Sequence, residues 1–169
     1  MIERLERFLA EVEPGRGARV VSYQPISGGY SRISARAGIR WADGREETLI
    51  LRGDPPAGSG VFVSDRDAEW ELLGALPNLN SVETAPTRWY DSSGDYLGAK
   101  CIVMDSVDAT SLQAVLADAD DIGPLSDLFV DTFAAIHGSP LDPLPERISP
   151  APRRHRITPA IGSDHRRQR

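Results

Sequence analysis

The sequence predicts an α+β fold built on a five-stranded antiparallel sheet, and three observations lead to that prediction. First, runs of β-branched and aromatic residues are separated by short turns, among them Asp43-Gly44, a pair that favours tight hairpins. Second, a segment with helical periodicity, 65–76, follows the third such run. Third, helical periodicity returns after the fifth run. The expected order is therefore helix, three strands, helix, two strands and two helices.

The first half of the chain supplies a helix and three strands. Apolar residues at helical spacing, Ile2, Leu5, Leu9 and Val12, predict an amino-terminal helix that Pro14-Gly15 ends. We expect strands at 19–26, 33–41 and 48–52. The small residues 27–31 form the first turn, and a loop rich in glycine and proline occupies 53–60.

The second half begins with the helix at 65–76, for which Ser64 or Asp65 is a suitable N-cap. Strands are expected at 87–91 and 97–104, and helices at 111–116 and 125–137. After Ser139 the chain has six prolines and no apolar period, which is typical of a disordered tail.

Composition favours a cytoplasmic protein that does not enter membranes. The chain has one cysteine, Cys101, and so forms no internal disulfide, which fits a reducing compartment. No apolar run approaches the roughly 20 residues that span a bilayer. The net charge of -6 disfavours nucleic-acid binding by the chain as a whole, although seven arginines follow Asp142.

Several residues are candidates for binding a phosphorylated ligand. Glycines in the turn Ser27-Gly28-Gly29-Tyr30-Ser31 let backbone N–H groups approach an anion, and Arg52 ends the strand beneath that turn. Each feature also has an ordinary interpretation: a surface hairpin, a surface ion pair of Arg52 with Glu69, and a core side chain for Met104.

The order of elements is that of the small lobe of a kinase. Five motifs occur along this order: Ser27-Gly28-Gly29-Tyr30-Ser31-Arg32, Leu49-Ile50-Leu51-Arg52 followed by Asp54-Pro55, Glu69-Trp70 with Leu72-Leu73 and Leu76, Val103-Met104-Asp105, and Phe133-Ala134-Ala135-Ile136-His137. With these motifs the chain resembles the aminoglycoside phosphotransferase-like family over about residues 20 to 140. Arg52 stands where protein kinases have a lysine, and "LR…P" is common in this family.

The resemblance implies that ATP is the cofactor, with Mg²⁺ expected for the family. It implies that Arg52 pairs with Glu69 to hold the phosphates, and that the backbone of the connector Met104-Asp105-Ser106-Val107 binds adenine. The expected domain boundaries are 1–18 for the amino-terminal helix, 19–104 for the small lobe, 105–142 for the connector and a partial large lobe, and 143–169 for the tail.

The residues that would catalyse phosphoryl transfer are missing from the pattern. His137-Gly138 is followed by Ser139, and both asparagines, Asn78 and Asn80, precede the connector, so no Asp-x-x-x-x-Asn loop can follow it. The sequence therefore has no catalytic residue and no Mg²⁺ ligand to name. We expect a truncated or frame-disrupted relative of a small-molecule hydroxyl kinase, inactive as it stands and with an acceptor that the sequence does not identify.

An alternative from a different class is a non-catalytic interaction module. In that interpretation the lobe is a scaffold, and the arginines of the tail contact a partner or the phosphates of a nucleic acid. The two interpretations differ in geometry. An ATP lobe requires Gly28 and Gly29 over a cleft, Arg52 within reach of Glu69, and unpaired backbone groups over 105–107. Separately, we expect the truncated large lobe to leave Phe129, Phe133 and Ile136 poorly buried.

Overall fold

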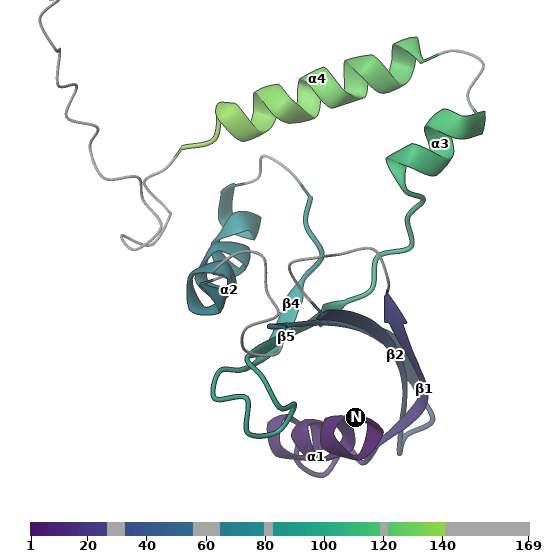
Figure 1. Cartoon of the computed structure of the whole chain (residues 1–169), viewed down its shortest axis with the longest axis vertical. Coiled ribbons are helices and arrows are strands. Elements are labelled where there is room, and N and C mark those ends of the chain that lie inside the picture. Colours follow the sequence, from purple (N-terminus) through teal and green to yellow (C-terminus); the bar gives the residue numbers. More distant parts are fainter. Residues whose placement is uncertain (27–32, 56–64, 80–82, 119–121, 141–169) are drawn as a thin grey trace, which may run out of the picture.

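The computed structural model of the chain describes residues 1–26, 33–55, 65–79, 83–118 and 122–140. The described elements are α1 (Ile2–Val12), β1 (Ala18–Ile26), β2 (Ile33–Trp41), β3 (Glu46–Gly53), α2 (Arg66–Ala75), the 3-10 helix η1 (Leu76–Leu79), β4 (Thr87–Asp91), β5 (Cys101–Asp105), α3 (Leu112–Asp118) and α4 (Gly123–His137). The predicted order of helices and strands is confirmed (Figure 1).

The five strands form one antiparallel sheet in the order β1-β2-β3-β5-β4, as predicted. The β2–β3 hairpin closes through the expected turn, where Gly44 has a φ of 86° and its N–H donates to the carbonyl oxygen of Trp41 at 2.9 Å. A left-handed φ of this kind is accessible to glycine at little cost, which explains the Asp-Gly signal in the sequence. The protein is therefore an α+β fold on a five-stranded antiparallel sheet.

The hydrophobic core lies between α1 and one face of the sheet. Leu5, Phe8 and Leu9 of α1 are buried against alternate residues of the strands. Those strand residues include Ala35, Ala37, Ile39, Trp41, Leu49, Leu51, Cys101 and Val103. Because side chains alternate along a strand, the residues between them point to the other face. The alternation of β2 thus assigns Arg36 and Arg40 to the face away from α1.

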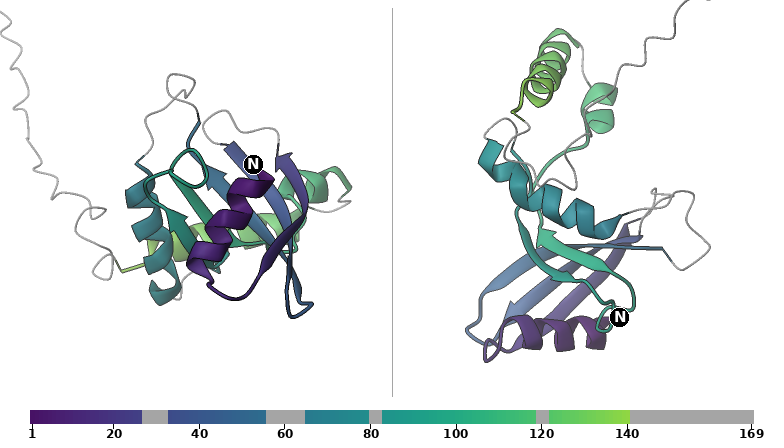
Figure 2. Two further views of the ribbon diagram at one scale, coloured as in Figure 1. Left: turned by 90° about the horizontal axis from the view of Figure 1, so that it is seen from below. Right: turned by 90° about the vertical axis from the view of Figure 1, so that its left-hand side faces the viewer.

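Helix α2 lies on the side of the sheet opposite α1 (Figure 2). Asp65, one of the two N-cap candidates from the sequence, is the N-cap of this helix, since its carboxylate accepts the N–H of Ala68 at 3.0 Å. The helix ends one residue earlier than predicted, at Ala75, and the chain continues through Pro77 as the 3-10 helix η1.

The prediction that a strand begins at Leu97 is wrong, because β5 begins at Cys101. The cause is a turn organised by the buried carboxylate of Asp91. It accepts the backbone N–H groups of Gly94, Tyr96 and Leu97 at 2.9, 3.1 and 2.7 Å. Backbone groups that bind this carboxylate are not available for pairing with a neighbouring strand.

Helices α3 and α4 lie away from the sheet, beyond α2 (Figures 1 and 2). Helix α4 exposes a broad apolar surface: Phe129, Phe133 and Ile136 are 60%, 53% and 52% exposed. The prediction that these three side chains are poorly buried is confirmed. In the described part of the chain, no helix combines the length and the apolar character required to cross a membrane.

Candidate functional site

The strand cation and the helix carboxylate singled out in the sequence form an ion pair. Nη2 of Arg52, near the end of β3, donates to Oε1 of Glu69 on α2 at 2.8 Å. Both side chains are more than half buried, so water screens this pair less than it would a surface pair. The expectation that Arg52 and Glu69 come together is confirmed.

Arg52 retains an unused donor within this pair. Its Nε is buried, and the described residues supply no acceptor for it. A buried N–H without an acceptor costs about 1–3 kcal/mol, and native proteins leave few such groups unpaired. The Arg52 side chain is 31% exposed, so its guanidinium presents a positive charge to an anion at the surface while its Nε stays buried.

A third charged residue, Arg66, completes the cluster, and sequence reasoning missed it. Its side chain is fully buried and binds two carboxylates. Nη1 donates to Oε2 of Glu69 at 2.5 Å, while Nε and Nη2 donate to Oδ1 of Asp54 at 3.0 and 2.6 Å. Glu69 is thus held between Arg52 and Arg66. The i,i+3 spacing of Arg66 and Glu69 was the available signal.

Asp67 connects helix α2 to β4, the edge strand of the sheet. Asp67 accepts the hydroxyl of Tyr90 on β4 at 2.5 Å and Nζ of Lys100 at 2.6 Å. Burial and the bond to Asp67 raise the pKa of Tyr90 above its ordinary value, so the hydroxyl stays protonated and donates. The ring of Tyr90 also stacks on Trp70 with ring centres 5.4 Å apart. These contacts fix the helix turn that carries Glu69.

The sheet face next to Arg52 is apolar. Arg52 pairs across strands with Ile102, and Ile50 pairs with Met104. Residues paired directly across antiparallel strands point to the same face, so these four side chains share one surface. Met104 is buried and lies on this face rather than in the α1 core. An apolar patch therefore adjoins the cation on the side toward the connector.

The expectation of unpaired backbone groups in the connector is wrong for two of its residues. The N–H of Asp105 donates to the carbonyl oxygen of Pro86 at 2.9 Å, and that of Ser106 donates to Thr48 at 3.2 Å. The sheet extends one residue further than predicted, to Asp105, and its pairing consumes these donors. Val107 lies past the strand and is 54% exposed.

A polar groove of about 620 Å³ opens beside the connector. The residues that line it include Arg36, Thr48, Asp105, Ser106, Val107 and Asp108. Neither Arg52 nor Glu69 lines this groove. Leu49 pairs with Asp105, and Arg52 lies three positions after Leu49 on the same strand. Because a strand rises about 3.4 Å per residue, the connector and the cation are about 10 Å apart along the sheet.

The glycine turn Ser27 to Ser31 lies outside the described residues, so its position over Arg52 stays a prediction. The ranges that the structure describes contain no group of three or more His, Cys, Asp or Glu side chains suited to a metal ion. We therefore assign no residue to Mg²⁺.

No protein-family model matches the sequence. The interpretation of the site therefore depends on its geometry, which consists of Arg52 paired with Glu69, the apolar patch beside Arg52, and the polar groove at the connector.

Proposed function

We propose that residues 18–108 are a nucleotide-binding lobe of the aminoglycoside phosphotransferase-like kind, which binds ATP without transferring its phosphate. The observation that carries this proposal is the Arg52–Glu69 pair. A carboxylate from the helix orients a cation from the central strand, and the cation keeps a buried Nε free of described partners. Arginine suits this role because its planar fork can bind a carboxylate and a phosphate at once.

The rest of the face fits the other parts of a nucleotide. Ile50 is partly exposed and offers an apolar surface for a flat base between the connector and Arg52, with the buried Met104 paired beside it. The separation of about 10 Å between connector and cation suits a base at one end and the first phosphates at the other. Since the N–H groups of Asp105 and Ser106 are already paired, base recognition falls to groups beyond the strand, starting at Val107.

The proposal is limited to binding. The sequence offers no asparagine after Asn80 and no Asp-x-x-x-x-Asn loop after the connector, so we name no residue for the base and metal-ligand roles of phosphoryl transfer. The alternative, an interaction module that uses the basic tail, depends on residues after 142, which lie outside the described part of the chain. No contact among the described residues favours it.

The test is titration with a fluorescent ATP analogue. We expect saturable binding to the wild type and a loss of at least about tenfold in affinity for Arg52→Glu, which reverses a charge that contacts phosphate. Arg40→Glu is the control, because it makes the same change of charge in the exposed Arg40–Glu46 pair. Arg40 lies near the end of β2, whereas Arg52 is paired with Ser34 near its start, so this variant should leave the affinity unchanged. Equal effects of the two variants, or no binding to the wild type, would contradict the proposal that this site binds ATP. Phosphate transfer above background would contradict the proposal that the protein binds ATP without transferring its phosphate.

A further inference from the structure

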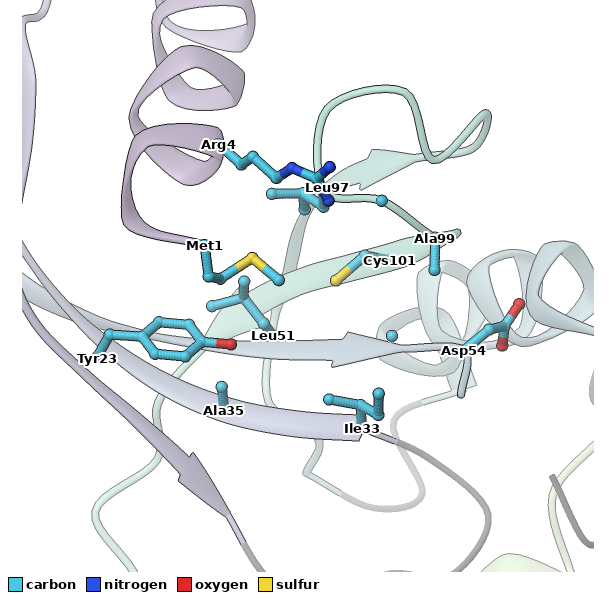
Figure 3. Close-up of a pocket in the computed structure, with 12 residues that line it drawn as sticks. Met1, Arg4, Tyr23, Ile33, Ala35, Leu51, Asp54, Leu97, Ala99 and Cys101 are labelled. Atoms are coloured by element: carbon cyan, nitrogen blue, oxygen red, sulfur yellow. The ribbon is translucent and has the colours of Figure 1, made fainter. Parts of the chain in front are cut away.

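A second cavity, of about 260 Å³, lies on the face of the sheet opposite Arg52. Figure 3 shows the residues that line it. Its walls are the odd-numbered positions of the strands, including Ile33, Ala35, Leu51 and Cys101, together with Leu97 from the Asp91 turn. These positions belong to the same face as the α1 core. The cavity therefore has no wall in common with the Arg52–Glu69 pair.

The cavity exists because α1 covers only part of this face. The helix packs through Leu5, Phe8 and Leu9, and the cavity lies at its amino-terminal end, where Met1 and Arg4 line it. Two of the sheet residues that line the cavity, Ala35 and Gly53, are small. A Cβ built on Gly53 would meet its nearest neighbours, Cys101 Sγ and the carbonyl oxygen of Ile33, only at 3.8 Å. The space is thus a consequence of side-chain size.

The interior is apolar, with neutral polar groups. Figure 3 shows the Tyr23 hydroxyl, the Met1 thioether and the Cys101 thiol directed toward a common space. Burial raises the pKa of Tyr23, and it raises the pKa of Cys101 to about 12, so both groups stay protonated at neutral pH. No acceptor for the Tyr23 hydroxyl is found among the described residues, which leaves it available to a ligand.

One cation lies at the rim. Arg4 projects from the first turn of α1 over Leu97, and its guanidinium rests against Gly98. A Cβ at Gly98 would come within 2.2 Å of Arg4 Nη1, and Gly98 has a φ of 89°, so glycine is what allows this placement. Arg4 has no hydrogen bond or ion pair with the described residues. The acidic group that lines the cavity, Asp54, is bound by Arg66.

We propose that this cavity is a binding site for a small aromatic or aliphatic monocarboxylate. The apolar body would fill the space above Ala35 and Leu51, and the carboxylate would pair with Arg4. A cavity of roughly 150 Å³ holds one benzene ring, so 260 Å³ has room for a ring with a substituent. Apolar walls with a few convergent polar groups are typical of small-molecule sites.

The chain provides its own reporter for this site. It has two methionines, Met1 and Met104. Met1 lines the cavity, and Met104 lies on the other face beside Ile50. In protein labelled with ¹³C on the methionine methyl groups, 4-fluorobenzoate should move the Met1 signal saturably and leave the Met104 signal in place. For a ligand of this size we expect a dissociation constant of roughly 1 mM.

Matched variants separate the charge from the volume. Arg4→Gln should weaken 4-fluorobenzoate roughly fivefold to tenfold, whereas Arg7→Gln, one turn along the same helix, should change it less than about twofold. Neutral 4-fluorobenzyl alcohol should bind Arg4→Gln and the wild type equally. Gly53→Val should fill part of the cavity and weaken both probes.

Three results would overturn the proposal. They are an unmoved Met1 signal at several times the expected dissociation constant, equal effects of Arg4→Gln and Arg7→Gln, and a Met104 shift in place of a Met1 shift. A nucleotide should instead move Met104, so the same labelled protein tests the two proposed sites separately. Failure at one site leaves the result at the other intact.

Discussion

Arg66 binds Asp54 through two nitrogens of one guanidinium, Nε and Nη2, which lie 3.0 and 2.6 Å from the same carboxylate oxygen. The pair joins the first turn of α2 to the residue that follows β3. Arg66 also binds Glu69, which in turn binds Arg52. The position of the strand cation is therefore set by a charged chain of four residues, in which the fully buried member is Arg66.

Removal of Arg66 should destabilise the fold strongly. Arg66→Met keeps the length of the side chain but leaves Asp54 and Glu69 without their buried cation. Breaking one partner of a buried pair costs about 3–5 kcal/mol, and because Asp54 is partly exposed we expect about 3 kcal/mol, measured by urea unfolding.

Arg40→Met is the matched control for Arg66→Met. The Arg40–Glu46 pair has the same 2.6 Å distance, but both side chains are 57% exposed. Exposed pairs contribute about 0–1 kcal/mol, so this variant should lie within that range. If both variants lowered the free energy of unfolding equally, burial would not be what makes the Arg66 cluster important.

The difference in burial between Arg66 and Arg40 also shows which features of the fold could be predicted from the sequence. The buried face of β2 follows a pattern that the sequence contains, an apolar residue at every second position from Ala35 to Trp41. Arg66 sits between two aspartates at a helix start, a context typical of exposed residues. Its burial depends on Asp54, twelve residues away, and local patterns carry no such information. The predicted start of β5 was wrong for a related reason. The turn before β5 depends on hydrogen bonds to one side chain, Asp91, and the local sequence pattern does not show them.

Asp91 itself provides a second test. Asp91→Ala would leave the N–H groups of Gly94, Tyr96 and Leu97 without their acceptor. Buried unpaired donors cost about 1–3 kcal/mol each, partly recovered by water, so we expect a loss of about 3 kcal/mol in the free energy of unfolding. Asp91→Asn keeps one acceptor oxygen and should lose about half as much.

Asp43→Ala is the control for the Asp91 variants. Asp43 accepts one N–H, that of Arg45 at 2.9 Å, in an exposed turn where water can replace it. We expect a loss of no more than about 1 kcal/mol. A loss for Asp91→Ala as small as that for Asp43→Ala would show that the turn after β4 does not depend on the carboxylate.

Two glycines with similar backbone angles should respond differently to alanine. Gly15 and Gly94 have φ values of 82° and 78°. A Cβ at Gly15 meets nothing within 4 Å, whereas at Gly94 it would lie 2.8 Å from the backbone of Ala99. Gly15→Ala should cost about 1 kcal/mol, the penalty for the left-handed conformation alone. Gly94→Ala must also displace the backbone, and thermal unfolding should show a clearly larger loss; equal losses would contradict the close packing of this turn.

The buried thiol should make stability depend on alkaline pH. Burial raises the pKa of Cys101 to about 12 from an ordinary value near 9. Between these values the unfolded chain releases a proton that the folded chain keeps, so the free energy of unfolding falls as pH rises above about 9, by up to about 1.4 kcal/mol per pH unit. Below pH 9 both states hold the proton and this group adds no slope.

Urea unfolding of the wild type and Cys101→Ala at pH 8, 9 and 10 measures the effect. Tyr23 and Tyr90 also have raised pKa values, but they are present in both proteins and contribute mainly above pH 10. Cys101→Ala should be less stable at every pH because it leaves a cavity, yet its stability should fall less steeply between pH 9 and 10. Parallel pH profiles would mean that the thiol ionises equally in both states.

The apolar surface of α4 should contribute little to the stability of the sheet. Phe129 and Phe133 stack on each other with ring centres 6.1 Å apart and remain 60% and 53% exposed. The double variant Phe129→Ser/Phe133→Ser removes two exposed rings, so the urea midpoint of the sheet should be nearly unchanged while binding of a hydrophobic dye decreases. Phe8→Ala is the control: Phe8 is 3% exposed in the core beneath α1, and its loss should cost about 3–5 kcal/mol. A large drop in the midpoint for the double variant would show that α4 packs on the lobe in solution, and its aromatic face would then belong to the core rather than to the surface.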